Sequence, residues 1–414
     1  MKPQFYFIII FSFLLSLDAY ATSIEVCSTC KYKTLKSAID AAVDGDKIIV
    51  KKGIYKEGNI VITKSIQLIG IDFPILDGEN ETEILTINAK NVTVEGFQIQ
   101  NVGTSYIEDR AGIRFEKANN FVVRNNRLFN TFFGIYLAHS NDGIVEGNYV
   151  EGKAVEEMSS GNAIHIWYCK RVKVENNRVN GHRDGIYFEF VDNSLIQNNL
   201  SENNLRYGLH FMFSNDDNYY NNEFRNNGAG VAVMFSRRIN MSENLFVHNW
   251  GKASYGLLLK EIYDAEIINN RFEENTIGIF VEGSTRINYI NNDFVSNGWA
   301  VKVSGGCMNN IVKGNNFVAN TFDLSLNSSA YENVIDGNYW SEYSGYDLDR
   351  DGVGDVPHRP IKLFNYVLKN TPEAIVLMRS LFIDLINFSE KVSPIFTPEN
   401  VIDNEPSMKV FSRN

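Results

Sequence analysis

The sequence predicts an all-β protein, a right-handed parallel β-helix, because two series of residues share one period near 22. The first series is an Asn followed two places later by a large apolar residue: Asn126, Asn148, Asn177, Asn198, Asn222, Asn244, Asn270, Asn292, Asn315 and Asn338. The second is the first apolar residue of a short alternating strand: Ile113, Ile135, Ile164, Ile186, Leu209, Val231, Leu257, Ile279, Val301 and Leu324.

The residues within each repeat favour strands and turns. Segments such as 134–137 and 185–190 alternate with period two, as strands do. The paired Asn residues suit turns, since Asn tolerates the left-handed conformation, and stacked Asn side chains can bond from rung to rung. A leucine-rich repeat of similar length needs a Leu pattern that is absent here. One rung cannot bury its apolar face alone, so the rungs must stack into a solenoid.

The predicted solenoid needs a protected end and carries insertions. Residues 34–43 (TLKSAIDAAV) read as a short amphipathic helix that caps the open end over a first strand, Lys47–Val50. Extra residues predict loops at Glu151–Gly161 and His248–Ser254, with a third at Gly103–Asp109. Insertions on one edge of a solenoid often mark the binding side.

The chain divides into three parts. Lys2, an apolar run from Phe5 to Leu17 and the Ala19-Tyr20-Ala21 site predict a signal peptide over 1–21, cleaved after about Ala21, with an uncleaved anchor as the alternative. Residues 22–340 form the β-helix with its cap, and 341–414 a C-terminal segment. With 44% hydrophobic and 21% charged residues the chain is globular. Its net charge of −11, without basic runs, argues against nucleic-acid binding.

The outward strand positions gather a soft set of side chains. If the first and third positions of each strand face the core, His210, Met212 and Met234 face out on neighbouring rungs, about 4.8 Å apart. Imidazole and two thioethers suit Cu(I) better than Mg²⁺, Ca²⁺ or Mn²⁺. His165 and Trp167 lie two rungs away on the same face. The alternatives are packing under an overhanging loop or against a partner, and carbohydrate stacking on Tyr136, Trp167 and Tyr187.

The four cysteines allow one sensible pairing. Cys169 and Cys307 belong to strands six rungs apart, about 29 Å at the strand spacing, and cannot pair within the chain. Cys27 and Cys30 can form a disulfide, the default for an exported protein; thiolate copper binding and redox exchange are the alternatives.

The C-terminal segment holds an Asp-rich loop and an apolar stretch. Asp347, Asp349, Asp351 and Asp355, with the carbonyl of Val353, match the start of a calcium loop, although His358 stands where an EF-hand has Glu. A structural Ca²⁺ or a plain solvated turn is expected. Residues 372–388 read as one apolar helix that meets a partner or membrane, or folds back on the solenoid. The stretch from Ser393 should be extended or mobile.

Several segments together resemble the NosD family. They are GHRDGIYFEF (181–190), RYGLHFMFSN (206–215), GAGVAVMFS (228–236), GNYWSEYSGYDLDRDGVGD (337–355) and IDAAVDGDKIIVKKGIY (39–55). The resemblance covers nearly the whole mature chain, and the run with His210, Met212 and Met234 discriminates best, since other β-helix proteins share the remaining motifs.

The resemblance implies a periplasmic accessory protein of nitrous oxide reductase maturation, which is not an enzyme. Such a protein works with an ABC transporter (the NosF ATPase and NosY permease) and the copper lipoprotein NosL, docks on the permease through 372–388, and delivers Cu(I) to the reductase. It meets the membrane only through the permease. His210, Met212 and Met234 become the favoured copper site, with Met158, His165, His182, Cys27 and Cys30 as weaker candidates.

A different class of function also fits a β-helix. Polysaccharide lyases, epimerases and hydrolases need convergent acid, base and charge-stabilising groups in a groove. The outward columns offer Glu116, Glu189, Asp184 and Arg183. They show no tight cluster of carboxylates with Lys or Arg on adjacent rungs, so a carbohydrate-active enzyme is the alternative expectation.

Overall fold

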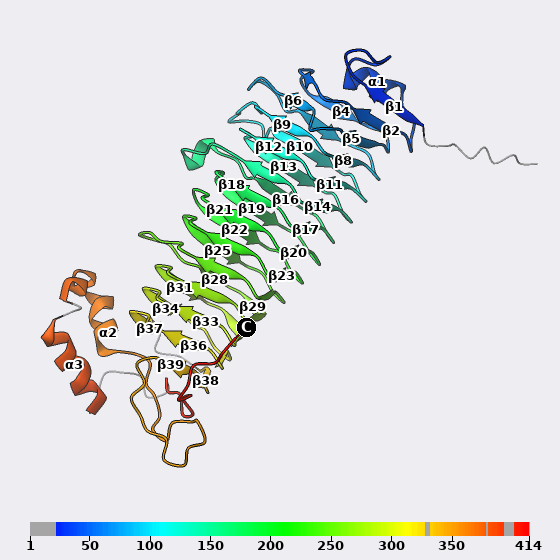
Figure 1. The fold of residues 1–414 in the computed structure, drawn as a ribbon. Helices are drawn as coiled ribbons and strands as arrows, with labels where there is room; N and C mark the ends of the chain where they lie inside the picture. The colour runs from blue at the N-terminus through cyan, green and yellow to red at the C-terminus, as the bar shows by residue number, and fades with distance from the viewer. Residues whose placement is uncertain (1–21, 328–331, 378–379, 393–400, 414) are drawn as a thin grey trace, which may run out of the picture.

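The computed structural model describes residues 22–327, 332–377, 380–392 and 401–413, and these form a parallel β-helix (Figure 1). Each rung contributes one strand to each of three parallel sheets, which we name A, B and C in the order in which the chain visits them. The predicted fold class is confirmed. The predicted signal peptide lies outside the described residues.

Sheet A has 14 strands: β1 (Ser23–Val26), β2 (Lys47–Val50), β5 (Gln67–Gly70), β8 (Thr93–Glu95), β11 (Val122–Arg124), β14 (Ile144–Glu146), β17 (Lys173–Glu175), β20 (Leu195–Gln197), β23 (Asn218–Tyr220), β26 (Asn240–Ser242), β29 (Tyr263–Ile268), β32 (Thr285–Ile290), β35 (Ile311–Lys313) and β38 (Val334–Asp336). Sheet B has 13: β3 (Ile54–Tyr55), β6 (Ile75–Asp77), β9 (Gln98–Gln100), β12 (Arg127–Phe129), β15 (Tyr149–Glu151), β18 (Arg178–Asn180), β21 (Leu200–Glu202), β24 (Glu223–Arg225), β27 (Leu245–Val247), β30 (Arg271–Glu273), β33 (Asp293–Val295), β36 (Asn316–Val318) and β39 (Tyr339–Trp340). Sheet C has 12: β4 (Ile60–Ile62), β7 (Leu85–Ile87), β10 (Ala111–Glu116), β13 (Phe133–Ala138), β16 (Ile164–Trp167), β19 (Asp184–Glu189), β22 (Tyr207–Met212), β25 (Ala229–Met234), β28 (Leu257–Lys260), β31 (Ile277–Glu282), β34 (Trp299–Ser304) and β37 (Phe322–Leu326).

A buried Asn ladder runs along the turn between sheets A and B. Each Asn accepts, on its side-chain oxygen, the main-chain N–H and the side-chain amide of the Asn one rung earlier, as Asn222 does from Asn199 at 3.0 and 2.9 Å. The predicted ladder is confirmed except at one rung, where the member is Asn199 and not Asn198. The prediction followed the apolar Leu200, but here the inward core position holds the small, fully buried Ser201.

Two further ladders, which were not predicted from the sequence, provide acceptors for main-chain N–H groups at the other two turns. Between sheets B and C, buried side chains accept the main-chain N–H of the preceding rung, as Asn204 does from His182 and Asn227 from Asn204. Between sheets C and A, Ser and Cys side chains do the same, as Ser214 does for Val191. Buried main-chain donors need such partners, so these side chains hold the turns in register.

The core is a column of apolar side chains between the three sheets. On the inward face of sheet B, six aromatic rings stack with neighbouring centroids between 4.2 and 5.5 Å apart: Phe224, Phe246, Phe272, Phe294, Phe317 and Trp340. The predicted inward residues of sheet C, including Leu209, Phe211, Val231 and Val233, are fully buried. The predicted in–out register is therefore correct.

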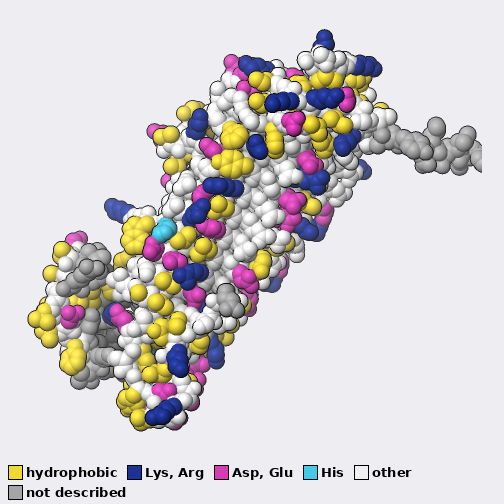
Figure 2. All heavy atoms as spheres, viewed as in Figure 1, with side chains coloured by type: hydrophobic (Ala, Val, Ile, Leu, Met, Phe, Trp, Pro, Cys, Tyr) yellow, Lys and Arg dark blue, Asp and Glu magenta, His cyan; other side chains and the backbone are white. Residues whose placement is uncertain are grey.

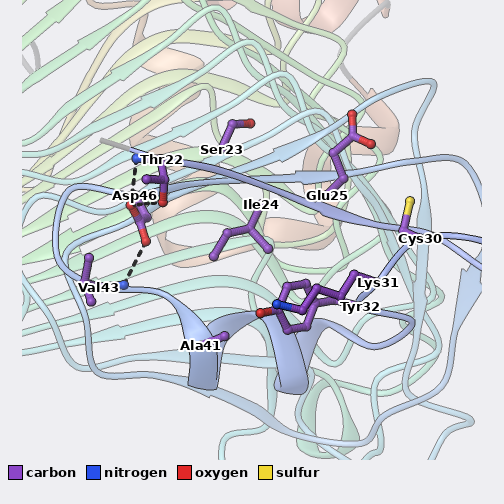
Figure 3. Close-up of a pocket in the computed structure, with 10 residues that line it drawn as sticks. All are labelled: Thr22, Ser23, Ile24, Glu25, Cys30, Lys31, Tyr32, Ala41, Val43 and Asp46. Atoms are coloured by element: carbon purple, nitrogen blue, oxygen red, sulfur yellow. Dashed lines mark hydrogen bonds between the residues drawn. The ribbon is translucent and has the colours of Figure 1, made fainter. Parts of the chain in front are cut away.

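The N-terminal end carries the predicted cap. Helix α1 (Leu35–Ala41) begins after Thr34, whose hydroxyl accepts the N–H of Ser37, and its apolar residues are buried. Strand β1 precedes the predicted first strand, β2, and pairs with it. Asp46 joins the two by accepting the N–H groups of Thr22 and Val43 (Figure 3).

Helices pack beside the C-terminal rungs, and a segment of the chain returns along them. The predicted 372–388 helix is wrong as one unit: the segment η2 (Pro372–Leu377) and the helix α3 (Leu381–Val392) are separate, and Ser380 accepts the first N–H groups of α3. A helix that was not predicted, α2 (Leu363–Asn370), precedes them. Buried residues of α2 and α3 pack on Phe322 and Trp299 of sheet C.

Residues 401–413 pass back along the last rungs. Asp403 is fully buried and accepts the main-chain N–H and side-chain amide of Asn338 at 2.9 and 3.1 Å. The same carboxylate oxygen accepts the indole N–H of Trp340 at 2.9 Å. Asp403 thus takes the place of the next Asn and ends the A–B ladder.

The three predicted loops all leave sheet B and enter sheet C, so they lie on one edge of the solenoid. Their tips expose apolar side chains: Tyr106, Ile107, Val155, Met158 and Trp250. The middle loop contains the short segment η1 (Glu157–Ser159).

The Asn ladder predicts that two Asn→Ala substitutions differ strongly in their effect on the free energy of unfolding. We expect Asn222→Ala to lower the free energy of unfolding by about 2–3 kcal/mol, because it leaves the buried N–H of Asn199 without an acceptor. Asn240→Ala, at an exposed strand position, should change it by no more than about 0.5 kcal/mol. Thermal unfolding followed by circular dichroism measures both, and equal effects would contradict the ladder's role.

Candidate functional site

The candidate ligands lie in two outward columns on sheet C. In the first, Tyr136, His165, Tyr187, His210 and Ala232 are register partners from rung to rung. In the second, Trp167, Glu189, Met212, Met234 and Lys260 follow one another in the same way. Parallel strands keep partners about 4.8 Å apart, so Met212 and Met234 lie side by side. Both methionines are half-buried, between a carboxylate on one side and an ammonium group on the other.

His210 is covered although it faces away from the core. It is 6% exposed, and its ring contacts Tyr187 edge-on, with centroids 5.1 Å apart, and Tyr207 at 4.8 Å. Its Nδ1 lies 3.4 Å from the guanidinium of Arg206 and 3.8 Å from the carboxylate of Asp184. Its Nε2 is buried and has no hydrogen-bond partner among the described residues. A buried ring nitrogen without a hydrogen-bond partner calls for an explanation, and a bound ligand is one.

A buried ion pair supports this histidine, and the sequence reading missed it. Asp184 is fully buried and accepts two N–H groups of Arg206, at 2.9 and 2.6 Å. Burial alone would raise the pKa of Asp184, but His210 and Arg206 lower it below its ordinary value. This rung is 23 residues long, so the register partner of Asp184 is Tyr207, and the side chain of Arg206 reaches back to the carboxylate. The sequence led us to expect no tight cluster of carboxylates with Lys or Arg on adjacent rungs, and here a single carboxylate pairs with Arg from the next rung.

Neighbouring side chains hold the ring of His165 in place. Its ring is stacked between Tyr136 and Tyr187, with centroids 4.4 and 4.7 Å away. Asn162 uses its amide oxygen to accept from Arg183, so its NH₂ group donates to Nδ1 of His165 at 2.9 Å. Burial lowers the pKa of His165 to about 3, so the ring stays neutral. With Nδ1 accepting, the proton lies on Nε2, and no ring lone pair is left for a metal.

His182 is part of the turn between sheets B and C. It is 1% exposed, its Nδ1 lies 3.0 Å from the carbonyl of Asn180, and its Nε2 lies 3.1 Å from the hydroxyl of Thr131. Burial lowers the pKa of His182 to about 4. Both nitrogens are engaged, and His182 stands one rung before Asn204, which accepts its main-chain N–H.

The remaining soft candidates lie apart from the Met212–Met234 pair. Met158 is 93% exposed in the middle loop. Glu157, the residue before Met158, interacts electrostatically with Arg206. Burial lowers the pKa of Arg206, but its acidic neighbours, chiefly Asp184, raise it above its ordinary value. Cys27 and Cys30 form a disulfide with Cα atoms 5.0 Å apart, so their sulfurs are not thiolates in this state. Cys169 and Cys307 do not pair with each other, as predicted, and both are free and buried.

The Asp-rich loop brings its carboxylates together. One oxygen from each of Asp347, Asp349 and Asp351 lies within 4.8 Å of the others. Asp355 accepts the N–H of Leu348 at 2.7 Å and closes the loop. The charge of Asp351 raises the pKa of Asp349 above its ordinary value. Val353 forms an isolated antiparallel bridge with Ser407 of the returning segment, so the loop contacts the C-terminal residues.

The aromatic residues near the site cover one another. Tyr136 and Tyr187 turn their faces to His165 and are 7% and 9% exposed, so they do not offer faces to a sugar. A second stack, Tyr168, Phe190, Phe213 and Phe235, follows the Trp167–Met234 column, and each of its members has a positive φ between 50° and 55°. This stack, which was not predicted, borders the methionines with half-exposed ring edges.

The described cavities do not coincide with the methionine pair. A cavity of about 580 Å³ lies at the N-terminal cap, lined by Thr22, Cys30, Tyr32 and Asp46 among others (Figure 3). Another, of about 420 Å³, lies under the first loop beside Glu83 and Arg114. Met212 and Met234 line neither of these two cavities.

The chain matches the family described as "Periplasmic copper-binding protein (NosD)" over residues 39–156 and 147–345. A probable ABC transporter binding protein NosD from Pseudomonas aeruginosa is 30% identical over 372 residues, which cover 85% of this chain and 86% of that protein. This chain belongs to the NosD family. The protein of the same description from Stutzerimonas stutzeri is 28% identical over 374 residues, covering 86% of this chain and 85% of that one.

Solved structures share the fold of this NosD family member at low identity. An α-1,3-glucanase from Streptomyces thermodiastaticus has a TM-score of 0.59 at 13% identity, with 74% of this chain and 65% of that chain covered. An exopolygalacturonase from Yersinia enterocolitica has a TM-score of 0.56 at 10% identity, with 77% and 78% covered. At this identity the likeness concerns the fold alone. Within the described residues, no helix is both long and apolar enough to cross a membrane.

The buried histidine of the turn predicts a pH effect on stability. His182 titrates near pH 4 in the folded protein and near 6.5 when unfolded, so between these values only the unfolded chain takes up the proton. Stability should therefore fall as pH falls through this window. Between pH 7 and pH 5, the free energy of unfolding of the unaltered protein should fall by about 1–2 kcal/mol more than that of His182→Asn.

Urea unfolding at the two pH values measures this difference. His248→Asn, at a half-exposed residue paired with Glu274, is the matched control and should not alter the pH difference. An equal loss in the His182 variant and the unaltered protein would contradict the assignment.

Proposed function

We propose that this NosD family member binds Cu(I) through His210, Met212 and Met234 and delivers it for copper-site assembly in nitrous oxide reductase. The observation that carries the proposal is the buried, unpartnered Nε2 of His210 on the strand whose Met212 is the register partner of Met234. An imidazole with two thioethers is a neutral, soft ligand set, which Cu(I) prefers. The family's description as copper-binding supports the same cargo.

The environment of the three side chains suits a metal that must be released. Met212 and Met234 are half-buried, so a partner protein can approach their sulfurs from solvent. Ligand exchange needs no catalytic acid or base. The metal can pass from these thioethers to a partner's ligands as new bonds replace old ones.

The alternative, a carbohydrate-active enzyme, is less well supported. Asp184 is the carboxylate closest to His210, but it is fully buried and engaged with Arg206. A carboxylate in that state is poorly placed to transfer a proton to a substrate. The stacked faces of Tyr136 and Tyr187 also leave no platform for a sugar ring.

Other sites complete the proposal. Met158, in the exposed middle loop, is a further proposed Cu(I) ligand that a movement of this loop would bring to the site. Cys27 and Cys30 would bind copper only after their disulfide is reduced. The loop of Asp347, Asp349, Asp351 and Asp355, with the carbonyl of Val353, is proposed to hold a structural Ca²⁺. The chain is exported to the periplasm by the predicted signal peptide.

The C-terminal helical segment is proposed to dock on the NosY permease of the ABC transporter, whose ATPase is NosF. Phe382, Leu385 and Phe388 of α3 are exposed while Ile383 packs inward, so the helix has an apolar outer face. Figure 2 shows hydrophobic side chains on the outside of this C-terminal lobe. Exposed apolar patches of this kind mark partner contacts. NosL and the reductase are the proposed donor and acceptor of copper.

Copper binding is tested by anaerobic Cu(I) titration of the mature protein against a competing chelator. We expect stoichiometric binding by the unaltered protein and its loss in Met212→Ala/Met234→Ala, because both thioethers are removed. Met308→Ala, at a half-exposed methionine elsewhere, is the control and should bind normally. Normal binding by the double variant would rule out this site.

Docking is tested by co-purification with NosF and NosY from detergent-solubilised membranes. We expect Phe382→Ser/Leu385→Ser/Phe388→Ser to weaken association about 10-fold or more, since apolar anchors carry much of an interface's energy. The control is Ile54→Ser/Val61→Ser/Val334→Ser, which removes exposed apolar side chains from the solenoid. Equal association of the two variants would contradict docking through α3.

A further inference from the structure

The Cys27–Cys30 disulfide lies in an exposed turn at the N-terminal cap. Both cysteines are only partly buried, and the two residues between them, Ser28 and Thr29, are exposed. Cys30 also lines the cavity of about 580 Å³ at the cap (Figure 3). A thiol in solution can therefore reach the disulfide. Exposed disulfides are commonly the labile, reactive ones.

The cap has other bonds that hold its conformation. The N–H of Cys27 donates to the carbonyl of Tyr32 at 3.1 Å, and the N–H of Cys30 donates to the carbonyl of Cys27 at 3.2 Å. Strand β1, just before the turn, pairs with β2, and Glu57 accepts the first two N–H groups of α1 at 2.7 and 3.0 Å. The disulfide joins residues only three positions apart, and so small a closed loop restricts the unfolded chain less than a long one does. The fold therefore depends little on this disulfide.

Positive charge surrounds the turn. Lys31 and Lys33 follow Cys30 closely and are exposed, and Lys31 lines the same cavity. On the neighbouring strand end, Lys51 pairs with Glu25 at 2.7 Å, so this carboxylate offsets only one of the three ammonium groups. Lysine side chains beside a Cys-x-x-Cys pair stabilise thiolates, which are the reactive form of cysteine.

The two sulfurs have different surroundings. Cys30 lines the cavity, from which an attacking thiolate can approach it. Sγ of Cys27 lies 3.4 Å from the hydroxyl of Thr29. A disulfide sulfur carries no proton, so the hydroxyl is the donor in this contact. The same hydroxyl can donate to Cys27 as a thiolate, which makes Cys27 the better leaving group when Cys30 is attacked.

We propose that Cys27 and Cys30 form a redox-active site that exchanges with a dithiol partner. A thiolate of the partner attacks Sγ of Cys30, a mixed disulfide forms, and the Cys27–Cys30 bond breaks with its electron pair on Cys27. The partner's second thiolate then attacks the partner's sulfur in the mixed disulfide and releases Cys30. Two electrons and two protons pass to the cysteines, and the partner becomes a disulfide. This activity is separate from copper binding on sheet C and does not depend on it.

The test is the reduction of the folded, mature protein by dithiothreitol, quenched with iodoacetamide and analysed by mass spectrometry. We expect Cys27 and Cys30 to be reduced and labelled within minutes at millimolar reductant. Cys169 and Cys307 are the internal control and should be labelled only after unfolding, because they are buried. A disulfide that resists reduction until the protein unfolds would overturn the proposal. So would a cap that becomes sensitive to protease on reduction, because the disulfide would then be a structural one.

The attacked sulfur is identified with single-cysteine variants of the pair and oxidised glutathione. The cysteine that forms the mixed disulfide in one direction of exchange is the one attacked in the other. We expect Cys30 in Cys27→Ser to form the mixed disulfide about 10-fold faster than Cys27 in Cys30→Ser, because Cys30 lines the cavity. Equal rates, or the reverse order, would overturn the assignment of Cys30 as the attacked sulfur.

The leaving group is tested with Thr29→Val, which keeps the shape of the side chain and removes the hydroxyl. We expect reduction by dithiothreitol to slow about 2–10-fold, because the departing thiolate of Cys27 loses a hydrogen-bond donor. Ser28→Ala, in the same exposed turn, is the matched control and should stay within about twofold of the unaltered protein. Equal rates for the two variants would overturn the role given to Thr29.

Discussion

At the A–B turn, the buried main-chain N–H of each ladder Asn depends on a side-chain oxygen supplied by the next rung. The oxygen of one Asn accepts both the N–H and the amide of the Asn before it, so neighbouring rungs cannot slip without breaking two bonds at once. Each such bond contributes about 1 kcal/mol, and an unsatisfied buried donor costs about 1–3 kcal/mol. The ladder therefore holds the strands in one register, and that register determines which outward side chains are neighbours on adjacent strands.

The candidate copper site is a consequence of this register. Register partners become lateral neighbours, which places Met212 beside Met234 and Asp184 beside Tyr207, within reach of the side chain of Arg206. A one-residue shift would turn the methionines into the core and bring Phe211 outward, because strand residues alternate between faces. The end of the ladder matters for the same reason. Asp403, from far along the chain, supplies the last acceptor that Asn338 requires.

Periodicity was enough to predict the fold, the three loops and the inward residues of sheet C, because all of these follow from spacing. It misplaced the ladder at Asn198, since a small Ser201 fills the core position there and the apolar Leu200 faces out. It did not predict that outward residues such as His210 and Ala232 are covered. Coverage depends on how side chains from adjacent rungs and loops lie over the sheet, and a period carries no such information.

The C-terminal elements escaped prediction for a related reason. Residues 372–388 are apolar enough for one helix, yet Ser380 starts a new one whose orientation is set by packing on Phe322 and Trp299. The partner of Asp403 lies 65 positions earlier, a contact that no local pattern can indicate. The Asp184–Arg206 pair also needed more than the period, because this rung is 23 residues long and the register partner of Asp184 is Tyr207.

A rigid ladder also limits how a metal site built on it can work. The strands cannot rearrange to release a cargo, so any change of ligands must come from side chains or from a partner. The arrangement divides these tasks: His210 is buried and set by its neighbours, whereas the methionines have flexible, half-exposed side chains. The bordering stack of Phe190, Phe213 and Phe235 keeps one side of the methionines apolar. A soft cation held in this way can be approached by a partner's sulfur ligands from the solvent side, while the nitrogen ligand stays fixed beneath it.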